Sequence, residues 1–271
     1  MARILTKETT LKKQQDELGV ESNFLNKISP KIMYSGIALF VIGLILKIFW
    51  KDADIIYIIG ALAAFIGFGQ KMKAKNNVDD IRKMKAGRKG EDMVLNQIQN
   101  RLNDYYYVLN DCTIQGSSGK AQIDHLIISD TGIFVVETKN YMGKIEGSAA
   151  ANKVLQTKQN KNGSIEKISL SNPVSQNEYH CKILKEFLKI YKIEIDESLI
   201  KSIIIFANNY TEVIITDVNE NAYVGKIFDS IQYITDFRSP LSIQDSVIIS
   251  LLKALLKDFD ESQLHQNAVT Q

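Results

Sequence analysis

The chain has 271 residues, of which 45% are hydrophobic and 24% are charged. This mixture is typical of folded proteins and argues against wholesale disorder. The formal net charge of +2 is too small to indicate nucleic-acid binding by itself. Cys112 and Cys181 lie far apart without C-x-x-C spacing, which excludes a disulfide framework and a cysteine zinc site and fits a reducing compartment. The three histidines are also scattered, so a metal site would consist mainly of carboxylate oxygens, which favours magnesium over zinc.

After a cytoplasmic N-terminal segment at residues 1–31, we expect a two-helix transmembrane hairpin at residues 32–70. Residues 32–50 are apolar except for Lys47, and residues 54–69 are apolar after Asp54. Each stretch is long enough for a short membrane span, with a turn at residues 51–54. Lys47 lies within one turn of its segment's end, where its amine can reach the membrane interface beside Trp50. A helical hairpin buried in protein is the alternative.

A basic juxtamembrane linker is expected at residues 71–86. Positive charge dominates from residue 71 to residue 89, where only Asp79 and Asp80 are acidic. The positive-inside bias therefore predicts that this flank is cytoplasmic. Because a hairpin returns the chain to its starting side, we expect a multi-pass membrane protein with both termini cytoplasmic. The positive charge can serve topology and anionic lipid alone, or it can also contact nucleic acid.

From residue 87 the pattern is α/β, and we expect one domain at residues 87–207 and a C-terminal α/β extension at residues 208–271. A helix is expected at residues 87–102, because its apolar residues recur at helical spacing. Strands are expected at residues 105–114, 122–129, 132–139 and 201–207, a strand pair at residues 153–157 and 164–169, and a short strand near Ala222. Further helices are expected at residues 173–191, with Asn172 as the cap, at 227–237 and at 241–259.

The segment QIDHLIISDTGIFVVETKN places two carboxylates and one amine in a single apolar hairpin. Glu137 and Lys139 are two residues apart, so a strand sends both side chains to one face. An even-numbered turn centred on residues 130–131 places Asp124 opposite Glu137 on that face, whereas a bulge at Gly132 shifts the register by one. Burial of these charges is costly unless a cation, a partner or a cleft compensates. The alternative is an exposed salt bridge across the strands.

Four segments in a fixed order resemble the nuclease-related domain (NERD) family. They are GRKGE at residues 87–91, QIDHLIIS at 122–129, GIFVVETKN at 132–140 and NPVSQNEYH at 172–180. This family is a branch of the PD-(D/E)XK nucleases, and the resemblance implies a restriction-endonuclease-like core with a central mixed β-sheet flanked by helices. Residues 149–155 lack the tryptophan that many members have there, so the resemblance to the family does not extend to the sequence of this substrate-facing loop.

The resemblance implies a role for each residue that matches these motifs. Asp124 and Glu137 would be metal ligands, with the carbonyl of Thr138 as an additional one, and Lys139 would orient water or stabilise charge on the phosphate. Glu91 would be the acidic residue of the preceding helix. The metal would be Mg²⁺ or Mn²⁺.

Two further polar residues lie on the helix that follows. Gln176 and His180 are four apart and share a helical face, so both can lean toward the site or a substrate phosphate. A glutamine in a capping turn and a packed histidine are the alternative reading of this pair. His125 alternates away from Asp124 along the strand, so we expect it on the opposite face and without a catalytic role.

These residues predict a membrane-anchored, metal-dependent nuclease that acts on DNA or RNA, with the lipid bilayer and nucleic acid as partners. One alternative is a membrane-tethered module that binds nucleic acid or acts as a scaffold without catalysis. Another is a structural protein that contacts anionic lipid. A nucleotide cofactor is not expected, because the chain lacks a phosphate-binding loop and a dinucleotide fingerprint. A homodimer would supply two sites for two strands.

Overall fold

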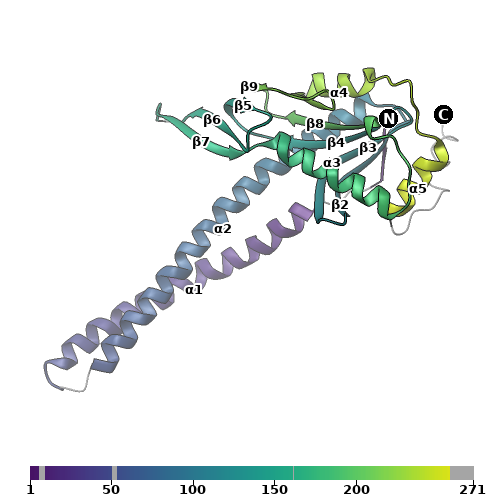
Figure 1. The fold of residues 1–271 in the computed structure, drawn as a ribbon. Helices are drawn as coiled ribbons and strands as arrows, with labels where there is room; N and C mark the ends of the chain where they lie inside the picture. Colours follow the sequence, from purple (N-terminus) through teal and green to yellow (C-terminus); the bar gives the residue numbers. More distant parts are fainter. Residues whose placement is uncertain (6–9, 51–53, 161, 257–271) are drawn as a thin grey trace. The chain divides into compact units, whose positions relative to one another are not determined.

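The computed structural model describes residues 1–5, 10–50, 54–160 and 162–256 (Figure 1). The chain divides into two compact units, which we call the α/β unit and the helical unit. The α/β unit combines Met1–Thr9 with Lys89–Gln271, and the helical unit is Thr10–Arg88. The helical unit is therefore an insertion between the first residues of the α/β unit and the rest of that unit.

The helical unit is built from α1 (Thr10–Lys47) and the first part of α2 (Asp54–Arg101). Both helices are long and apolar enough to cross a membrane. The turn was expected at residues 51–54. Residues 51–53 lie outside the described residues, and Asp54 is the first residue of α2. The basic stretch expected as a linker is helical, because α2 runs without a break from the apolar stretch into the α/β unit. Its lysines, arginines, methionines and alanines are good helix formers, and it has no proline.

Glycines allow α1 and α2 to approach closely in this unit. A Cβ added at Gly36 would lie 2.3 Å from the backbone nitrogen of Ala64, and one added at Gly60 would lie 2.3 Å from that of Phe40. A Cβ added at Gly43 would lie 2.5 Å from the backbone nitrogen of Tyr57, and one added at Gly67 would lie 2.4 Å from that of Met33. The residue numbers of each pair add up to 100, which defines one antiparallel register. Small residues permit such packing of helices in a membrane, where no hydrophobic effect drives association.

The α/β unit is centred on a six-stranded mixed sheet in the order β1-β2-β3-β4-β8-β10. Its strands are β1 (Arg3–Ile4), β2 (Tyr107–Gln115), β3 (Lys120–Ile128), β4 (Ile133–Lys139), β8 (Ile200–Phe206) and β10 (Ala222–Lys226). One apolar cluster joins one face of the sheet to α3 (Pro173–Ile190) and α5 (Asp245–Leu255). A second joins the other face to the end of α2 and to α4 (Ile227–Asp236). Helices thus cover both faces, as expected for a central mixed sheet.

A smaller sheet extends from this core in the order β7-β6-β5-β9 (Figure 1). Its strands are β5 (Gly143–Ser148), β6 (Lys153–Gln159), β7 (Ile165–Ser171) and β9 (Thr211–Thr216). The expected pairing of β6 with β7 is confirmed. Neither β5 nor β9 was expected from the sequence, since both are short and carry polar residues. A third apolar cluster, which includes Ile145, Val174 and Phe206, joins this sheet to α3 and β8.

The first strand was not expected either, because it has only two residues. In β1, the N–H of Arg3 donates to the carbonyl of Tyr106 (2.8 Å). The N–H of Leu5, just beyond the strand, donates to the carbonyl of Val108 (3.0 Å). Ala2 is buried in the second apolar cluster. The residues that precede the helical unit therefore form an edge of the main sheet.

The helices and strands that carry the motifs form close to their expected positions. Asn172 caps α3 by accepting a hydrogen bond from the N–H of Val174 (3.0 Å), and Pro173 stands in its first turn. All residues of β8 are buried, as a continuous apolar run predicts. The helix expected at residues 241–259 is shorter at both ends: α5 begins at Asp245 and ends at Leu255, where Leu256 turns to extended backbone.

Candidate active site

The hairpin of β3 and β4 has the register expected for an even-numbered turn. His125 pairs with Val136, and Ile128 pairs with Ile133 at the turn. The ladder ends at His125, so the expected pair of Asp124 with Glu137 does not form. Instead, Oδ2 of Asp124 accepts a hydrogen bond from the N–H of Thr138 (2.7 Å), one residue further along β4. The two strands separate at this point, and Asp124 lies in the fork between them.

Glu137 is the most deeply buried acidic side chain of the site. Its side chain is 3% exposed, and its Oε1 accepts a hydrogen bond from Nζ of Lys139. Its Oε2 lies 3.4 Å from Nδ1 of His180. Lys139 also donates to Oε1 of Gln176 (3.1 Å). The structure therefore brings Glu137, Lys139, Gln176 and His180 together, and both helical residues lean toward the site.

Helix α3 is fixed against the strands by a buried amide. Asn177 is fully buried, and its Nδ2 donates to the carbonyl of Val135 (2.8 Å) and to Oγ of Ser202 (2.9 Å). These bonds join α3 to β4 and β8. Because Gln176 precedes Asn177 and His180 follows it by less than one turn, this anchor sets where both reach the site.

Glu91 lies on α2 and interacts electrostatically with the carboxylates of the sheet. Burial raises the pKa of Glu91 to about 7, with further increases from Asp111, Asp92 and Glu137. Burial also raises the pKa of Asp124 well above its usual range, and Glu137 and Glu91 add to that effect. These mutual effects show that the expected acidic residue of the preceding helix lies near the acids of the hairpin.

Asp111 is an acidic neighbour that sequence reasoning missed. It lies within β2 in the left-handed backbone region, with a φ of 51°. Its flanking residues pair with His125 and Ile123, so Asp111 lies across from Asp124. Aspartate is depleted in β-strands, and its presence within β2 was the available signal.

The two basic groups of the site respond differently to burial. Burial lowers the pKa of Lys139, but Glu137 and other negative neighbours outweigh it, and the net pKa lies above its usual value. Lys139 is therefore a stable cation. Burial lowers the pKa of His180, an effect that Glu137 opposes and Lys139 reinforces. His180 is thus mainly neutral at neutral pH, since its ordinary pKa is already below 7.

The acids of this site fit a divalent cation held by few protein ligands. Oε2 of Glu137 is buried and has no hydrogen-bond partner among the residues described. In the same part of the chain, no group of three or more His, Cys, Asp or Glu side chains is arranged to hold a metal. Magnesium does not need such a group, since it keeps several waters and often uses one or two carboxylates with substrate phosphate. Asp124 and Glu137 could supply these two carboxylates. The role of the Thr138 carbonyl as an additional metal ligand stays a prediction.

His125 lies outside this site, on the opposite face as expected. It is 2% exposed, its Nδ1 lies 2.8 Å from Oδ1 of Asn110, and burial lowers its pKa to about 4. Both cysteines are free, Cys112 buried and Cys181 partly buried.

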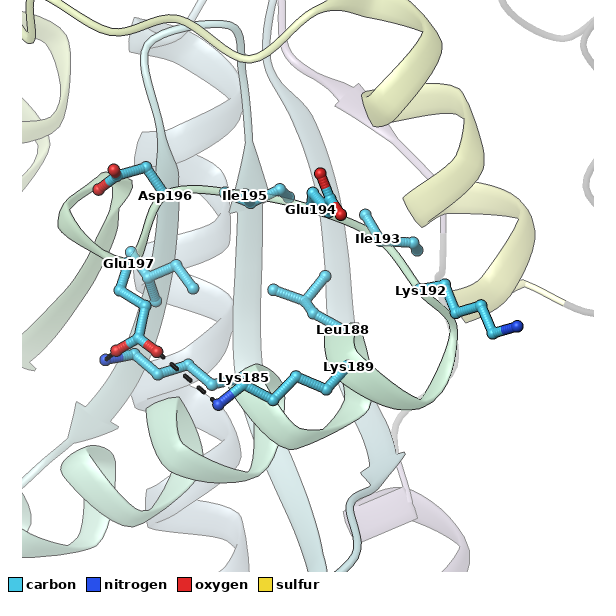
Figure 2. Close-up of a pocket in the computed structure, with 10 residues that line it drawn as sticks. Lys185, Leu188, Lys189, Lys192, Ile193, Glu194, Ile195, Asp196 and Glu197 are labelled. Carbon is cyan, nitrogen blue, oxygen red and sulfur yellow. Dashed lines mark hydrogen bonds and ion pairs between the residues drawn. The ribbon is translucent and has the colours of Figure 1, made fainter.

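A cavity of about 700 Å³ lies at the other end of the sheet (Figure 2). It is lined by Leu188, Ile200 and a salt bridge between Lys185 and Glu197 (2.7 Å). Ile200 pairs with Ile133 at the start of β4, whereas Lys139 is at its end. The chemistry of the site therefore does not use this cavity.

The fold and the acidic site together define a nuclease-like α/β domain. Residues 86–207 match the family model of the nuclease-related domain, so this part of the chain is a NERD domain. An uncharacterized protein of Bacillus anthracis is 40% identical over 100 residues, which are 36% of this chain and 45% of that protein. The chain thus covers less than half the length of this relative. No solved structure matches the chain.

Proposed function

We propose that this chain is a membrane-anchored nuclease that uses Mg²⁺ or Mn²⁺ to hydrolyse phosphodiester bonds of DNA or RNA at the cytoplasmic face. One observation carries the proposal: Glu137 is buried between Lys139 and His180, and Asp124 lies at the adjacent fork. Burying these groups costs stability, and a hydrophobic pair of similar size would hold the strands as well. Such an arrangement is more often found at functional sites than elsewhere.

The residues of the site suit phosphodiester hydrolysis. A divalent ion held by Asp124 and Glu137 would neutralise phosphate charge and make a bound water more acidic. The cationic Lys139 is held in place by Glu137 and Gln176, so its charge is already oriented when the transition state becomes more negative. Nδ1 of His180 lies 3.4 Å from Oε2 of Glu137, so a protonated His180 would add positive charge beside that carboxylate.

The division of the chain supports the proposed topology. The helical unit is inserted between β1 and the rest of the α/β unit, whose strands β1 and β2 are hydrogen-bonded to each other. If α1 and α2 each cross the bilayer once, the chain must therefore return to the side on which it started. The lysines and arginines that follow the apolar stretch of α2 support a cytoplasmic location for the α/β unit.

The test is cleavage of labelled single- and double-stranded DNA and RNA by the full chain in detergent, with Mg²⁺ or with a chelator. We expect Mg²⁺-dependent cleavage that Lys139→Met reduces at least 100-fold. Lys189→Met is the matched control, because Lys189 lies near the other end of α3 and its side chain is 78% exposed.

Tags at the two ends, probed with protease on sealed vesicles, test the topology. Cleavage of either tag from the extracellular side contradicts it.

The alternative is a membrane-tethered module that binds nucleic acid without catalysis. It is favoured by the absence of a three-ligand metal group among the described residues. A folded chain that binds nucleic acid equally with Mg²⁺ and with chelator, and cleaves no substrate, would establish this alternative.

A further inference from the structure

A second cavity lies at the same end of the sheet as the candidate active site. It has a volume of about 340 Å³, within the range of small-ligand sites. Its lining comes from α2, from the loop after β8 and from the junction of β10 with α4. The lining residues are Met93, Asn96, Gln97, Asn209, Lys226, Ile227 and Phe228.

The sheet register connects this cavity to the site. Phe206 on β8 pairs with Lys139 on β4 on one side and with Lys226 on β10 on the other. Lys139 and Lys226 therefore belong to one row across three strands, two strand spacings apart, which is about 10 Å. The cavity itself lies on the face that α2 and α4 cover, whereas Lys139 contacts Gln176 of α3 on the other face. A strand with one phosphate at Lys139 would therefore reach the cavity around the end of the sheet.

An aromatic ring stands at the cavity wall and is already in contact with a cation. Phe228 is 54% exposed, and the guanidinium of Arg101 lies 4.3 Å from its ring centroid. Oε1 of Gln97 accepts a hydrogen bond from Nε of Arg101 (3.0 Å), so the three side chains are ordered together. Exposed aromatic and guanidinium planes are the surfaces on which unpaired bases stack.

The remaining lining residues suit the edge of a base. Asn96, Gln97 and Asn209 carry carboxamides, which have both donors and acceptors and can match the hydrogen-bonding edge of a nucleobase. Met93 and Ile227 supply apolar surface. Nζ of Lys226 donates to the carbonyl of Asn208 (2.7 Å), which holds a positive charge at the rim for a phosphate.

We infer that this cavity binds an unpaired nucleobase of the same strand whose phosphate lies at Lys139. The inference rests on the proposed function and deepens it, because it assigns single-stranded nucleic acid, or an unpaired end of a duplex, as the substrate class. A blunt duplex cannot place a base in the cavity without unpairing it, which costs a few kcal/mol.

The experiment is fluorescence anisotropy with the full chain in detergent and chelator, so that cleavage plays no part. The probes are a labelled 12-nucleotide single strand of mixed sequence, as DNA and as RNA, and the matching blunt duplex. Phe228→Ala should raise the Kd for a single strand about 5-fold or more, the effect of one lost stacked base. It should leave the Kd for the duplex unchanged. Tyr105→Ala is the control, because Tyr105 is 72% exposed and does not line the cavity.

Equal loss of affinity for single strand and duplex, or no loss for either, would overturn the nucleobase pocket. So would failure of the unmodified chain to bind either form of single strand. If the chain cleaves nucleic acid but Phe228→Ala has no selective effect on the Kd for single strands, the proposed function stands and the nucleobase pocket is wrong. If Phe228→Ala has the selective effect but the chain cleaves no nucleic acid, the nucleobase pocket stands and the proposed nuclease function is wrong.

Discussion

Asp124 accepts a 2.7 Å hydrogen bond from the backbone N–H of Thr138 at the point where β3 and β4 separate. The carboxylate therefore has two roles that can be tested separately. Its hydrogen bond replaces the ladder pairing that is lost at the fork, and its charge is available to a cation. An amide oxygen at the same position could keep the first role, but it would lose the second.

Asp124→Asn should thus separate catalysis from stability. The amide oxygen can still accept from Thr138, so we expect a Tm equal to or above that of the unmodified chain, and cleavage reduced at least 100-fold. Asp124→Ala removes the bond as well, and a hydrogen bond to a charged group contributes about 1.5–3 kcal/mol. We expect a lower Tm for that variant. Thermal unfolding and cleavage rates measure both effects, and unchanged cleavage by Asp124→Asn would exclude Asp124 from the site.

Glu91 should make the α/β unit less stable as the pH rises. Its pKa is raised to about 7 in the folded chain, so the folded state holds a proton that the unfolded state loses above its ordinary pKa near 4.5. Stability is therefore lost between about pH 4.5 and pH 7. Glu91→Gln removes this effect. We expect its Tm to exceed that of the unmodified chain at pH 8 by about 2–4 °C, the shift that 1 kcal/mol causes in a domain of this size.

The difference between Glu91→Gln and the unmodified chain should disappear at pH 4, because the carboxyl is then protonated in both states. Asp104→Asn, which changes an exposed carboxylate just after α2, should show no such pH dependence. An equal gain for Glu91→Gln at pH 4 and pH 8 would mean that the effect is not electrostatic.

Mg²⁺ should stabilise the chain in the absence of any substrate. A ligand that binds only the folded state at 100 times its Kd adds about 2.7 kcal/mol to the free energy of unfolding. We expect a rise in Tm with Mg²⁺ at pH 8 that chelator reverses and Asp124→Asn abolishes. The rise should be smaller at pH 5, because the raised pKa of Asp124 favours a proton that competes with the metal. An undiminished rise in Asp124→Asn would place the metal elsewhere.

The motif-bearing strands and helices were predictable because their signals are local. The capping residue Asn172, the proline after it and the apolar run of β8 each act within a few residues. The site was predictable in its membership, since Glu137, Lys139, Gln176 and His180 do meet. Its geometry was not predictable, because no local signal in the sequence marks the residue at which β3 and β4 stop pairing. The β3–β4 ladder ends at His125, whereas β3 continues to pair with β2 as far as Lys120.

Contacts between distant parts of the chain could not be predicted from the sequence. Strand β1 consists of two residues and pairs with the edge of β2. In the same way, β9 forms beside β5 although its residues lie 68 positions further along the chain, as in the pair of Gly143 with Thr211. Asp111 joins the acidic neighbourhood through the pairing of β2 with β3. The β-propensities of individual residues do not predict such pairings, because the pairings depend on tertiary context.

The packing of the helical unit leads to a prediction that is independent of catalysis. A side chain at Gly60 would collide with the backbone of Phe40, so Gly60→Leu should separate α1 from α2 and lower the Tm of helix unfolding in detergent. Gly69→Leu is the matched control, because a Cβ at Gly69 meets nothing within 4 Å. Both changes add the same apolar group, so both chains should remain in the membrane fraction. Equal Tm values for the two variants would show that the close glycine contacts do not hold the hairpin together.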